Sequence, residues 1–341
     1  MKDILLKLSK GNHLTENEAE DAMNAMMNGS VTPAQIAAYL TLLQARGETI
    51  AELVGSARAM RDHALQLSVE GNIVDTCGTG GDGTGTFNIS TAAAIVAAAG
   101  GVPVVKHGNR AASSLAGSAD VLSALGVTIE MRPHVAAKCL AETGICFLFA
   151  QAYHPAMKHV APIRKELGFR TMFNILGPLT NPARPKRQVL GTPSIEIGRK
   201  MAHVLALLDC EHALVVTSDD GMDEISISGM SYLFEVRDHT VRESTLRPSD
   251  VDLHKSPLEA VRGGTPEQNA RMIEKIFTGE QGAKRDIVVI NAAAAFYVAG
   301  VVTSLQAGAR LAERMIDSGS AADKLRNLIE CSGRLGSEVS A

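Results

Sequence analysis

Residues 72–99 read NIVDTCGTGGDGTGTFNISTAAAIVAAA, and this stretch decides the fold. Its first six residues have the apolar pattern of a short buried strand, and a glycine-rich loop follows at 78–85. An alanine-rich helix is expected from Ser90 to Ala99. A strand, a loop and a helix in this order are the repeating unit of parallel sheets.

Strand and helix patterns continue to alternate after this unit. We expect strands at 103–106, 146–150, 188–192 and 212–217, helices at about 118–125 and 196–208, and a last strand–helix pair at 287–290 and 292–299. The fold class is therefore α/β. A large domain should hold a mainly parallel sheet flanked by helices.

The residues before this unit have the pattern of a small helical domain. Thr15 with Glu18, and Thr49 with Glu52, have the spacing of capping boxes, and Thr32 precedes a proline that suits the first helical position. We expect a small helical domain at 1–70 and a large α/β domain at 71–341 that carries the phosphate and metal loops. Part of the proline-rich segment at about 165–187 is expected to join the small domain.

Composition excludes several classes of protein. The chain has 341 residues, a formal charge of −4, 4% aromatic residues and no tryptophan, which disfavours nucleic-acid binding through positive potential or base stacking. Its five cysteines form no CxxC pair, which favours reduced thiols and a cytoplasmic location. No segment approaches the roughly 20 apolar residues of a membrane span. His154 and His159 lack the spacing of a zinc motif.

The glycine-rich loop contains GxGxxG at Gly78, Gly80 and Gly83, but the surrounding sequence disfavours a dinucleotide site. In a dinucleotide-binding unit the helix begins within the glycine motif, whereas here it is expected only from Ser90. The acidic residue that binds the ribose about 20 residues further on is also missing. The loop is either a structural turn or a phosphate cradle. Because Ser90 or Thr91 can cap the helix and leave its first N–H groups facing the loop, the cradle is favoured. Asp82 would repel phosphate, so it suits a sugar hydroxyl or a metal-bound water.

Two further loops follow strands, so they should lie at the same edge of the sheet. One runs from Lys106 to Ser114, and residues 117–120 then open the helix expected at about 118–125. A lone Lys106 or Arg110 would be a solvated charge and His107 an ordinary buried histidine, but two cations and several serines favour anion binding. The other loop contains Asp223 and Glu224, hard oxygen ligands that suit Mg²⁺ if a turn brings them together.

A last candidate is the stretch API at 161–163 followed by Arg164, with Arg170 six residues later. Either arginine can offer a planar fork to a small carboxylate. A charge on a helix surface is the competing interpretation.

Together these motifs resemble the anthranilate phosphoribosyltransferase family, a branch of the nucleoside phosphorylase and phosphoribosyltransferase superfamily. The resemblance rests on LTENEAEDAM, TPAQIAAYL, GTGGDGTGTFNIST, KHGNRAASSLAGSADVLSALGV, GFRTMFNILGPLTNPA and DGMDEIS. It implies a homodimer with its site between the two domains. It also implies Mg²⁺-dependent transfer of the phosphoribosyl group from 5-phosphoribosyl 1-pyrophosphate to the amine of anthranilate, the second step from chorismate to L-tryptophan.

The resemblance also assigns residues, with no nucleophile or acid–base residue among them and with Lys106 acting electrostatically. The implied anthranilate contacts are Gly78, Asn109 and Arg164, and the implied metal contacts are Ser90, Asp223 and Glu224. The implied donor-binding residues are Gly78, Gly81, Asp82, Thr86, Asn88, Ser90, Thr91, Lys106, His107, Gly108, Asn109, Ser113, Ser114 and Ser118.

Two alternatives remain open at this level. A pyrimidine nucleoside phosphorylase has a related architecture, but its loop after the second strand is rich in glycine and threonine, whereas this chain has KHGNR. A non-catalytic relative that binds nucleic acid should be basic and should lack the acidic pair. This chain has a charge of −4 and keeps Asp223 and Glu224.

Overall fold

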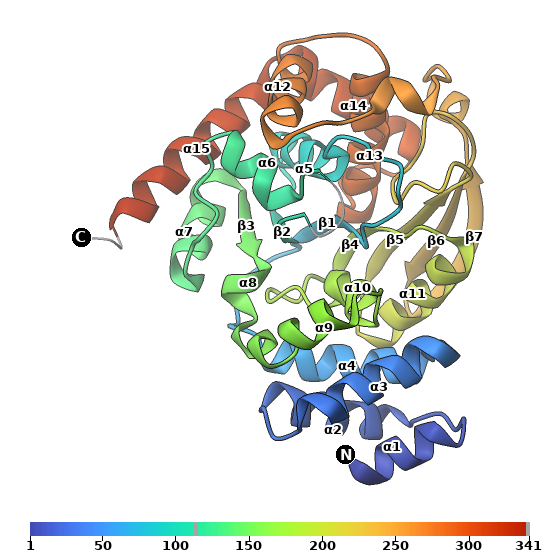
Figure 1. Cartoon of the computed structure of the whole chain (residues 1–341). Coiled ribbons are helices and arrows are strands. Elements are labelled where there is room, and N and C mark those ends of the chain that lie inside the picture. The colour runs from blue at the N-terminus through green and yellow to red at the C-terminus, as the bar shows by residue number, and fades with distance from the viewer. Residues whose placement is uncertain (112–114, 339–341) are drawn as a thin grey trace.

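The computed structural model describes residues 1–111 and 115–338. These residues form one seven-stranded sheet in the order β3-β2-β1-β4-β5-β6-β7 (Figure 1). The first five strands in chain order pair in parallel, and β6 and β7 extend the sheet as an antiparallel hairpin. The strands are β1 (Val74–Gly78), β2 (Val104–Gly108), β3 (Ile145–Phe149), β4 (Arg187–Gly191), β5 (His212–Ser218), β6 (Ser231–Arg237) and β7 (Thr240–Leu246). The mainly parallel sheet is confirmed.

Helices cover both faces of the sheet. One face packs against α5 (Ile89–Ala99) and α13 (Ala283–Ala299), with α14 (Leu305–Asp317) and α15 (Ser320–Glu338) behind them. Helix α7 (Pro133–Thr143) lies beside β3, and α6 (Ser118–Ala124) contacts α12 (Pro266–Phe277). On the other face α11 (Ile195–Leu207) packs on β5 and β6. Two short turns, η3 (Pro248–Val251) and η4 (Leu258–Val261), precede α12.

The N-terminal residues form α1 (Lys2–Ser9), α2 (Glu16–Met27), α3 (Pro33–Arg46) and α4 (Ile50–Asp62) at the opposite end of the molecule from α12 (Figure 1). Thr15, Thr32 and Thr49 each begin a helix with a complete capping box. The boxes at Thr15 and Thr49 were predicted from their spacing, whereas Thr32 was predicted only as a helix start before a proline. Among the described helices, none combines the length and apolar character needed to cross a bilayer.

The chain returns to this helical end between β3 and β4. This return segment contains α8 (Ala150–Tyr153), η1 (Pro155–His159), α9 (Ala161–Leu167), α10 (Phe173–Leu176) and η2 (Gly177–Leu179). Here η1 contacts α2, α9 contacts α3, and α10 contacts α4. Met172, Phe173 and Leu176 are buried in the same hydrophobic cluster as the N-terminal helices and α11.

Two local predictions are wrong. Residues 287–290 are not a strand, because they lie inside α13, whose side chains are buried almost all round. A continuous apolar run does not by itself distinguish a buried strand from a buried helix. Nor does Ser90 or Thr91 cap α5: the helix begins at Ile89 after Asn88, without a side-chain cap. The N–H of Ser90 instead donates to Glu224 Oε1 at 3.0 Å, so a carboxylate from a distant loop replaces the cap.

The close crossing of α2 and α4 leads to a first stability prediction. A Cβ on Gly55 would overlap the backbone carbonyl oxygen of Glu16. Gly55→Ala must therefore push the helices apart and should lower the free energy of unfolding by about 1–3 kcal/mol, measured by urea denaturation. Gly333→Ala is the matched control, because α15 has open space there. It should be neutral or slightly stabilising, and an equal loss in both variants would contradict the packing argument.

Candidate active site

The strand order places a crevice at the carboxyl ends of β1 and β4. These strands are neighbours, but the chain leaves β1 toward β2 on one side and β4 toward β5 on the other. Ligands of open α/β sheets bind where the strand order reverses in this way. Gly78 ends β1 and Gly191 ends β4, and a Cβ on either would overlap Asp223. The clash at Gly78 is with the carboxylate of Asp223 and the clash at Gly191 is with its backbone, so the absence of side chains at both strand ends lets Asp223 sit over the switch point.

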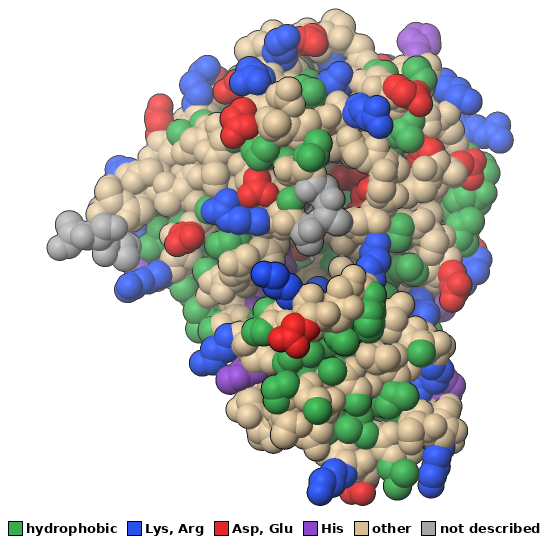
Figure 2. All heavy atoms as spheres, viewed as in Figure 1, with side chains coloured by type: hydrophobic (Ala, Val, Ile, Leu, Met, Phe, Trp, Pro, Cys, Tyr) green, Lys and Arg blue, Asp and Glu red, His purple; other side chains and the backbone are tan. Residues whose placement is uncertain are grey.

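The space-filling view shows a hollow between the α/β part and the helical part of the molecule, with acidic side chains in its depth (Figure 2). Residues 78–90, which we call the donor loop, lead from β1 to α5 at this edge of the sheet. Gly80 and Gly81 have φ angles of +68° and +70°, which explains why glycine occupies both positions. The N–H of Gly80 donates to Asp223 Oδ2 at 2.7 Å.

Asp223 and Glu224 form an acidic pair on the loop after β5. The chain bends at both residues, so the two adjacent carboxylates reach the donor loop together, as a shared cation would require. The pKa of each carboxyl is raised, first because burial disfavours the charged form and then because neighbouring carboxylates repel. Asp82 is one of those neighbours, and its side chain accepts a hydrogen bond from Thr84 Oγ1.

Lys106 supplies a buried positive charge beside the acidic pair. Its side chain is only 3% exposed, and Nζ donates to the carbonyl oxygen of Thr76 and, at 3.3 Å, to Ser90 Oγ. Burial and the Asp223 carboxylate raise the pKa of Glu224, and the charge of Lys106 offsets part of that rise. Because the ammonium group is held by β1 and the start of α5, it is fixed before any substrate binds.

The loop after β2 contributes the next group of predicted residues. Gly108 ends β2, and a side chain there would overlap Ser118 Oγ. The Asn109 carbonyl oxygen accepts hydrogen bonds from Ser118 Oγ at 3.4 Å and from Ala119 N at 3.2 Å, which closes the loop onto α6. Ser113 and Ser114 lie outside the described residues.

The remaining predicted donor-binding residues lie on or beside the donor loop. Asn88 Nδ2 donates to the carbonyl of Ala116 at 3.1 Å, and its Oδ1 accepts from Asn269 Nδ2 at 2.9 Å, so this amide joins the donor loop to the segment before α6 and to α12. Thr86 pairs with Arg262 through an isolated bridge. Thr91 Oγ1 is buried and has no hydrogen-bond partner among the described residues.

Arg164 is not part of this cluster. It lies on α9 in the return segment, with its guanidinium over the Phe173 ring at 5.2 Å and Nη2 donating to Asn174 Oδ1 at 3.5 Å. Burial lowers the pKa of Arg164. No carboxylate among the described residues forms an ion pair with it, so the fork stays available for an anion from outside.

Two buried polar residues beneath the site, Asp75 and Asn181, escaped the sequence analysis. Asp75 is fully buried on β1 and accepts from Asn181 Nδ2 at 2.9 Å and from His107 N at 3.2 Å. Burial raises the pKa of Asp75 to about 6. The rings of His107 and His154 lie 5.2 Å apart, both buried. The available signal was an acidic residue inside a short apolar strand, which requires buried partners.

The acidic pair fits Mg²⁺. Within residues 1–111 and 115–338 no group of three His, Cys, Asp or Glu side chains is arranged around a metal-sized space. Mg²⁺ needs no such group, because it commonly takes one or two carboxylates and completes its shell with water and substrate phosphates. Two carboxylates that repel each other and hold raised pKa values are better accommodated with a cation between them and the donor loop.

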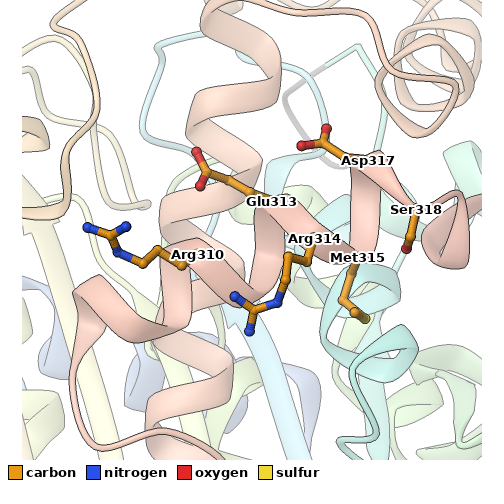
Figure 3. A pocket seen from close by; sticks show the side chains of 6 residues that line it. All are labelled: Arg310, Glu313, Arg314, Met315, Asp317 and Ser318. Carbon is orange, nitrogen blue, oxygen red and sulfur yellow. The ribbon is translucent and has the colours of Figure 1, made fainter.

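A surface pocket elsewhere has a different character. It measures about 690 Å³ and is lined by Arg310, Glu313, Arg314, Met315, Asp317 and Ser318, all on or just after α14 (Figure 3). Arg310 pairs with Asp252 at 2.8 Å and Asp317 with Arg285 at 2.8 Å. These charges are satisfied within the protein and lie away from the strand ends, so the pocket is not a candidate active site.

The helical part and the α/β part of the chain each match a family model, and together these matches give the class, a glycosyl transferase. The family described as "Glycosyl transferase family, helical bundle domain" matches residues 2–64, and the family described as "Glycosyl transferase family, a/b domain" matches residues 70–322.

Proteins with similar sequences indicate which family within this class the chain belongs to. The anthranilate phosphoribosyltransferase of Symbiobacterium thermophilum is 50% identical over 339 residues, 99% of each chain. That of Thermomicrobium roseum is 51% identical over 95% of each chain. This chain belongs to the anthranilate phosphoribosyltransferase family. The comparisons thus support the family resemblance and not the two alternatives, a pyrimidine nucleoside phosphorylase and a nucleic-acid-binding relative.

Solved structures agree with this membership. The crystal structure of the Thermus thermophilus enzyme has a TM-score of 0.91 and 46% identity, covering 96% of this chain and 98% of that one. The Saccharomyces cerevisiae enzyme in complex with PRPP and Mg has a TM-score of 0.89 and 27% identity, covering 98% and 99%. The same yeast enzyme has also been solved in complex with 4-fluoroanthranilate.

Proposed function

We propose that this protein transfers the phosphoribosyl group from 5-phosphoribosyl 1-pyrophosphate to the amine of anthranilate. The products are N-(5-phosphoribosyl)anthranilate and pyrophosphate, in the biosynthesis of tryptophan. The observation that carries the proposal is the acidic pair held against the donor loop and Lys106 at the switch point of the sheet. This arrangement suits a diphosphate with its divalent cation, and the family membership supports the identity of both substrates.

The difficult step is breakage of the bond between the anomeric carbon and the diphosphate oxygen, which leaves positive charge on the sugar and negative charge on the leaving group. Mg²⁺ held by Asp223, Glu224 and Ser90 would supply positive charge to that leaving group. The chain itself contributes the fixed ammonium of Lys106 and the N–H groups of the donor loop. Such preorganised charges stabilise the charge separation without reorganising during the reaction.

The acceptor needs positioning more than proton transfer. The amine of anthranilate is neutral near pH 7, so its lone pair can attack the anomeric carbon without a strong base. We assign no acid–base residue and no nucleophile. The donor-binding set that we propose is the one implied by the family resemblance, with Gly78 and Asn109 shared between donor and acceptor.

Arg164→Ala should raise the Michaelis constant for anthranilate by roughly 10–100-fold and leave that for the donor almost unchanged, because the lost group pairs with the acceptor carboxylate alone. Steady-state kinetics with each substrate varied in turn measure the split. Arg58→Ala, an exposed arginine on α4 that pairs with Glu16, is the control and should match wild type. A larger change for the donor than for anthranilate would overturn the assignment.

We further propose the organisation of the working enzyme. The small domain comprises residues 1–70 joined by part of 165–187, and the large domain comprises 71–341. Support comes from the contacts of the return segment with α2, α3 and α4. We propose a homodimer, as the family resemblance implies. We also propose a cytoplasmic location, in agreement with the free cysteines of the chain.

The direct test uses the fluorescence of anthranilate. With purified protein, the fluorescence of anthranilate should decrease only when both 5-phosphoribosyl 1-pyrophosphate and Mg²⁺ are present. The pyrophosphate released should equal the anthranilate consumed. A chain that leaves anthranilate untouched but cleaves pyrimidine nucleosides in phosphate buffer would refute the proposal.

A further inference from the structure

Arg170 joins the helical end of the molecule to the donor loop. It lies in the return segment between α9 and α10, two residues before the buried Met172. Its Nη1 donates to the carbonyl oxygen of Gly81 at 2.7 Å and its Nη2 to that of Gly80 at 3.2 Å. The guanidinium occupies the space that a Cβ on Gly81 would need. An exposed arginine thus uses both arms of its fork on two successive peptides.

Peptide geometry shows what this contact does. In a trans peptide the C=O and the following N–H point in opposite directions. The Gly80 carbonyl shares its peptide with the N–H of Gly81, and the Gly81 carbonyl shares its peptide with the N–H of Asp82. Since both carbonyls point at Arg170, both N–H groups point away from it. Neither N–H has a hydrogen-bond acceptor within the described part of the chain.

These two N–H groups adjoin the acidic pair. The N–H just before them, that of Gly80, donates to Asp223 Oδ2 at 2.7 Å, and the N–H of Asp223 lies 3.5 Å from Asp82 Oδ2. Successive glycines with positive φ and free N–H groups form a concavity that binds anions. With no side chain at Gly80 or Gly81, nothing in the loop itself fixes these peptides, so an external partner must do so.

We propose that Arg170 is a positioning residue that orients the peptides 80–81 and 81–82, so that two backbone N–H groups bind the diphosphate of the donor. The inference rests on the proposed function. A charge-assisted hydrogen bond to each carbonyl also polarises the peptide and makes its N–H a better donor. Arg170 acts through the loop and touches no reacting atom.

The same stretch of chain also reaches the acceptor arginine. The N–H of Thr171, next to Arg170, donates to Asn174 Oδ1 at 3.0 Å, and this oxygen also accepts from Arg164 Nη2 at 3.5 Å. Residues 170–174 therefore connect the donor loop to Arg164. Loss of the Arg170 side chain should act mainly on the donor, because the Thr171 link to Asn174 uses the backbone and survives.

The test compares Arg170→Ala and Arg170→Lys with wild type. We expect Arg170→Ala to raise the Michaelis constant for the donor and the Kd of Mg²⁺-pyrophosphate, measured by calorimetry, by about 30-fold, from the loss of two charge-assisted hydrogen bonds. Arg170→Lys keeps the charge but loses the planar fork, so it should raise the same two constants by about 5–10-fold, between wild type and Arg170→Ala. The Michaelis constant for anthranilate should change less than about threefold in both variants.

Two further measurements separate positioning from a general loss of structure. Added guanidinium chloride at low concentration should restore part of the pyrophosphate affinity of Arg170→Ala, and Lys165→Ala, an exposed residue of α9, should match wild type. Unchanged donor and pyrophosphate affinity in Arg170→Ala, or full activity in Arg170→Lys, would overturn the inference. Wild-type protein without transferase activity would instead refute the proposed function, so the two failures are distinguishable.

Discussion

Replacing Asp223 by Asn and Glu224 by Gln together should lower kcat by roughly 10³-fold or more, because the leaving diphosphate loses the site for its cation. Both substitutions keep an oxygen for the N–H groups of Gly80 and Ser90, so the loop contacts survive. The residual rate should respond only weakly to the Mg²⁺ concentration. Initial rates across a Mg²⁺ titration measure both effects.

In the absence of metal, the free energy of unfolding of this double variant should be equal to or greater than that of wild type. Two carboxylates with raised pKa values destabilise the folded state when they are ionised, and the neutral amides remove this cost. Thermal unfolding in a chelating buffer at pH 8 is the measurement. Asp219→Asn, an exposed change in the same loop, is the control and should keep full activity. Wild-type Mg²⁺ dependence in the double variant would remove the pair from the metal role.

The second large effect is acid lability caused by His107 and His154. Both rings are buried, and burial lowers the pKa of His107 to about 3 and that of His154 to about 4. In the unfolded chain these residues bind a proton near pH 6.5, whereas in the folded chain they stay neutral, so stability falls as pH decreases below 6.5. At pH 5 each histidine should cost about 2 kcal/mol of unfolding free energy relative to pH 7.

Urea unfolding of wild type and of a His107→Asn, His154→Asn variant at pH 7, 6 and 5 tests this. Asp75, whose pKa is raised to about 6, contributes in the opposite direction, so the difference between the two proteins is the quantity to compare. Between pH 7 and pH 5, the free energy of unfolding of the variant should fall by about 4 kcal/mol less than that of wild type. His134→Asn changes an exposed histidine and should follow wild type. Identical pH dependence in both proteins would contradict the role of the buried pair.

Local features of the fold were the most predictable. The capping boxes that begin at Thr15 and Thr49 depend on residues three apart, so their spacing was enough to predict them, and Thr32 was predicted as a helix start from the proline that follows it. The β6–β7 hairpin was not predicted, because alternating parallel units do not indicate where an antiparallel extension begins. The strand predicted at 287–290 is helical in α13, because its neighbours in the core and not its own composition decide its conformation.

In the site, as in the fold, local features were predictable from the sequence and contacts between distant residues were not. Chain order alone placed the glycine-rich turn, the lysine loop and the acidic residues after three of the predicted parallel strands, which was sufficient to bring them to one edge and to indicate a phosphate and a divalent cation. The partners of these groups came from distant parts of the chain. The carboxylate that holds the N–H of Ser90 lies 134 residues away, and the guanidinium that holds Gly81 lies 89 residues away.

The sequence by itself therefore determined the helical start, the alternating fold, the kind of ligand and the family. Only the tertiary structure decided which backbone N–H groups stay free, where Arg164 and Arg170 point, and that the acidic pair replaces a helix cap. The physical reason is that propensity and periodicity act over a few residues. Hydrogen bonds and buried charges act between whichever groups the packed chain brings within about 3 Å of each other.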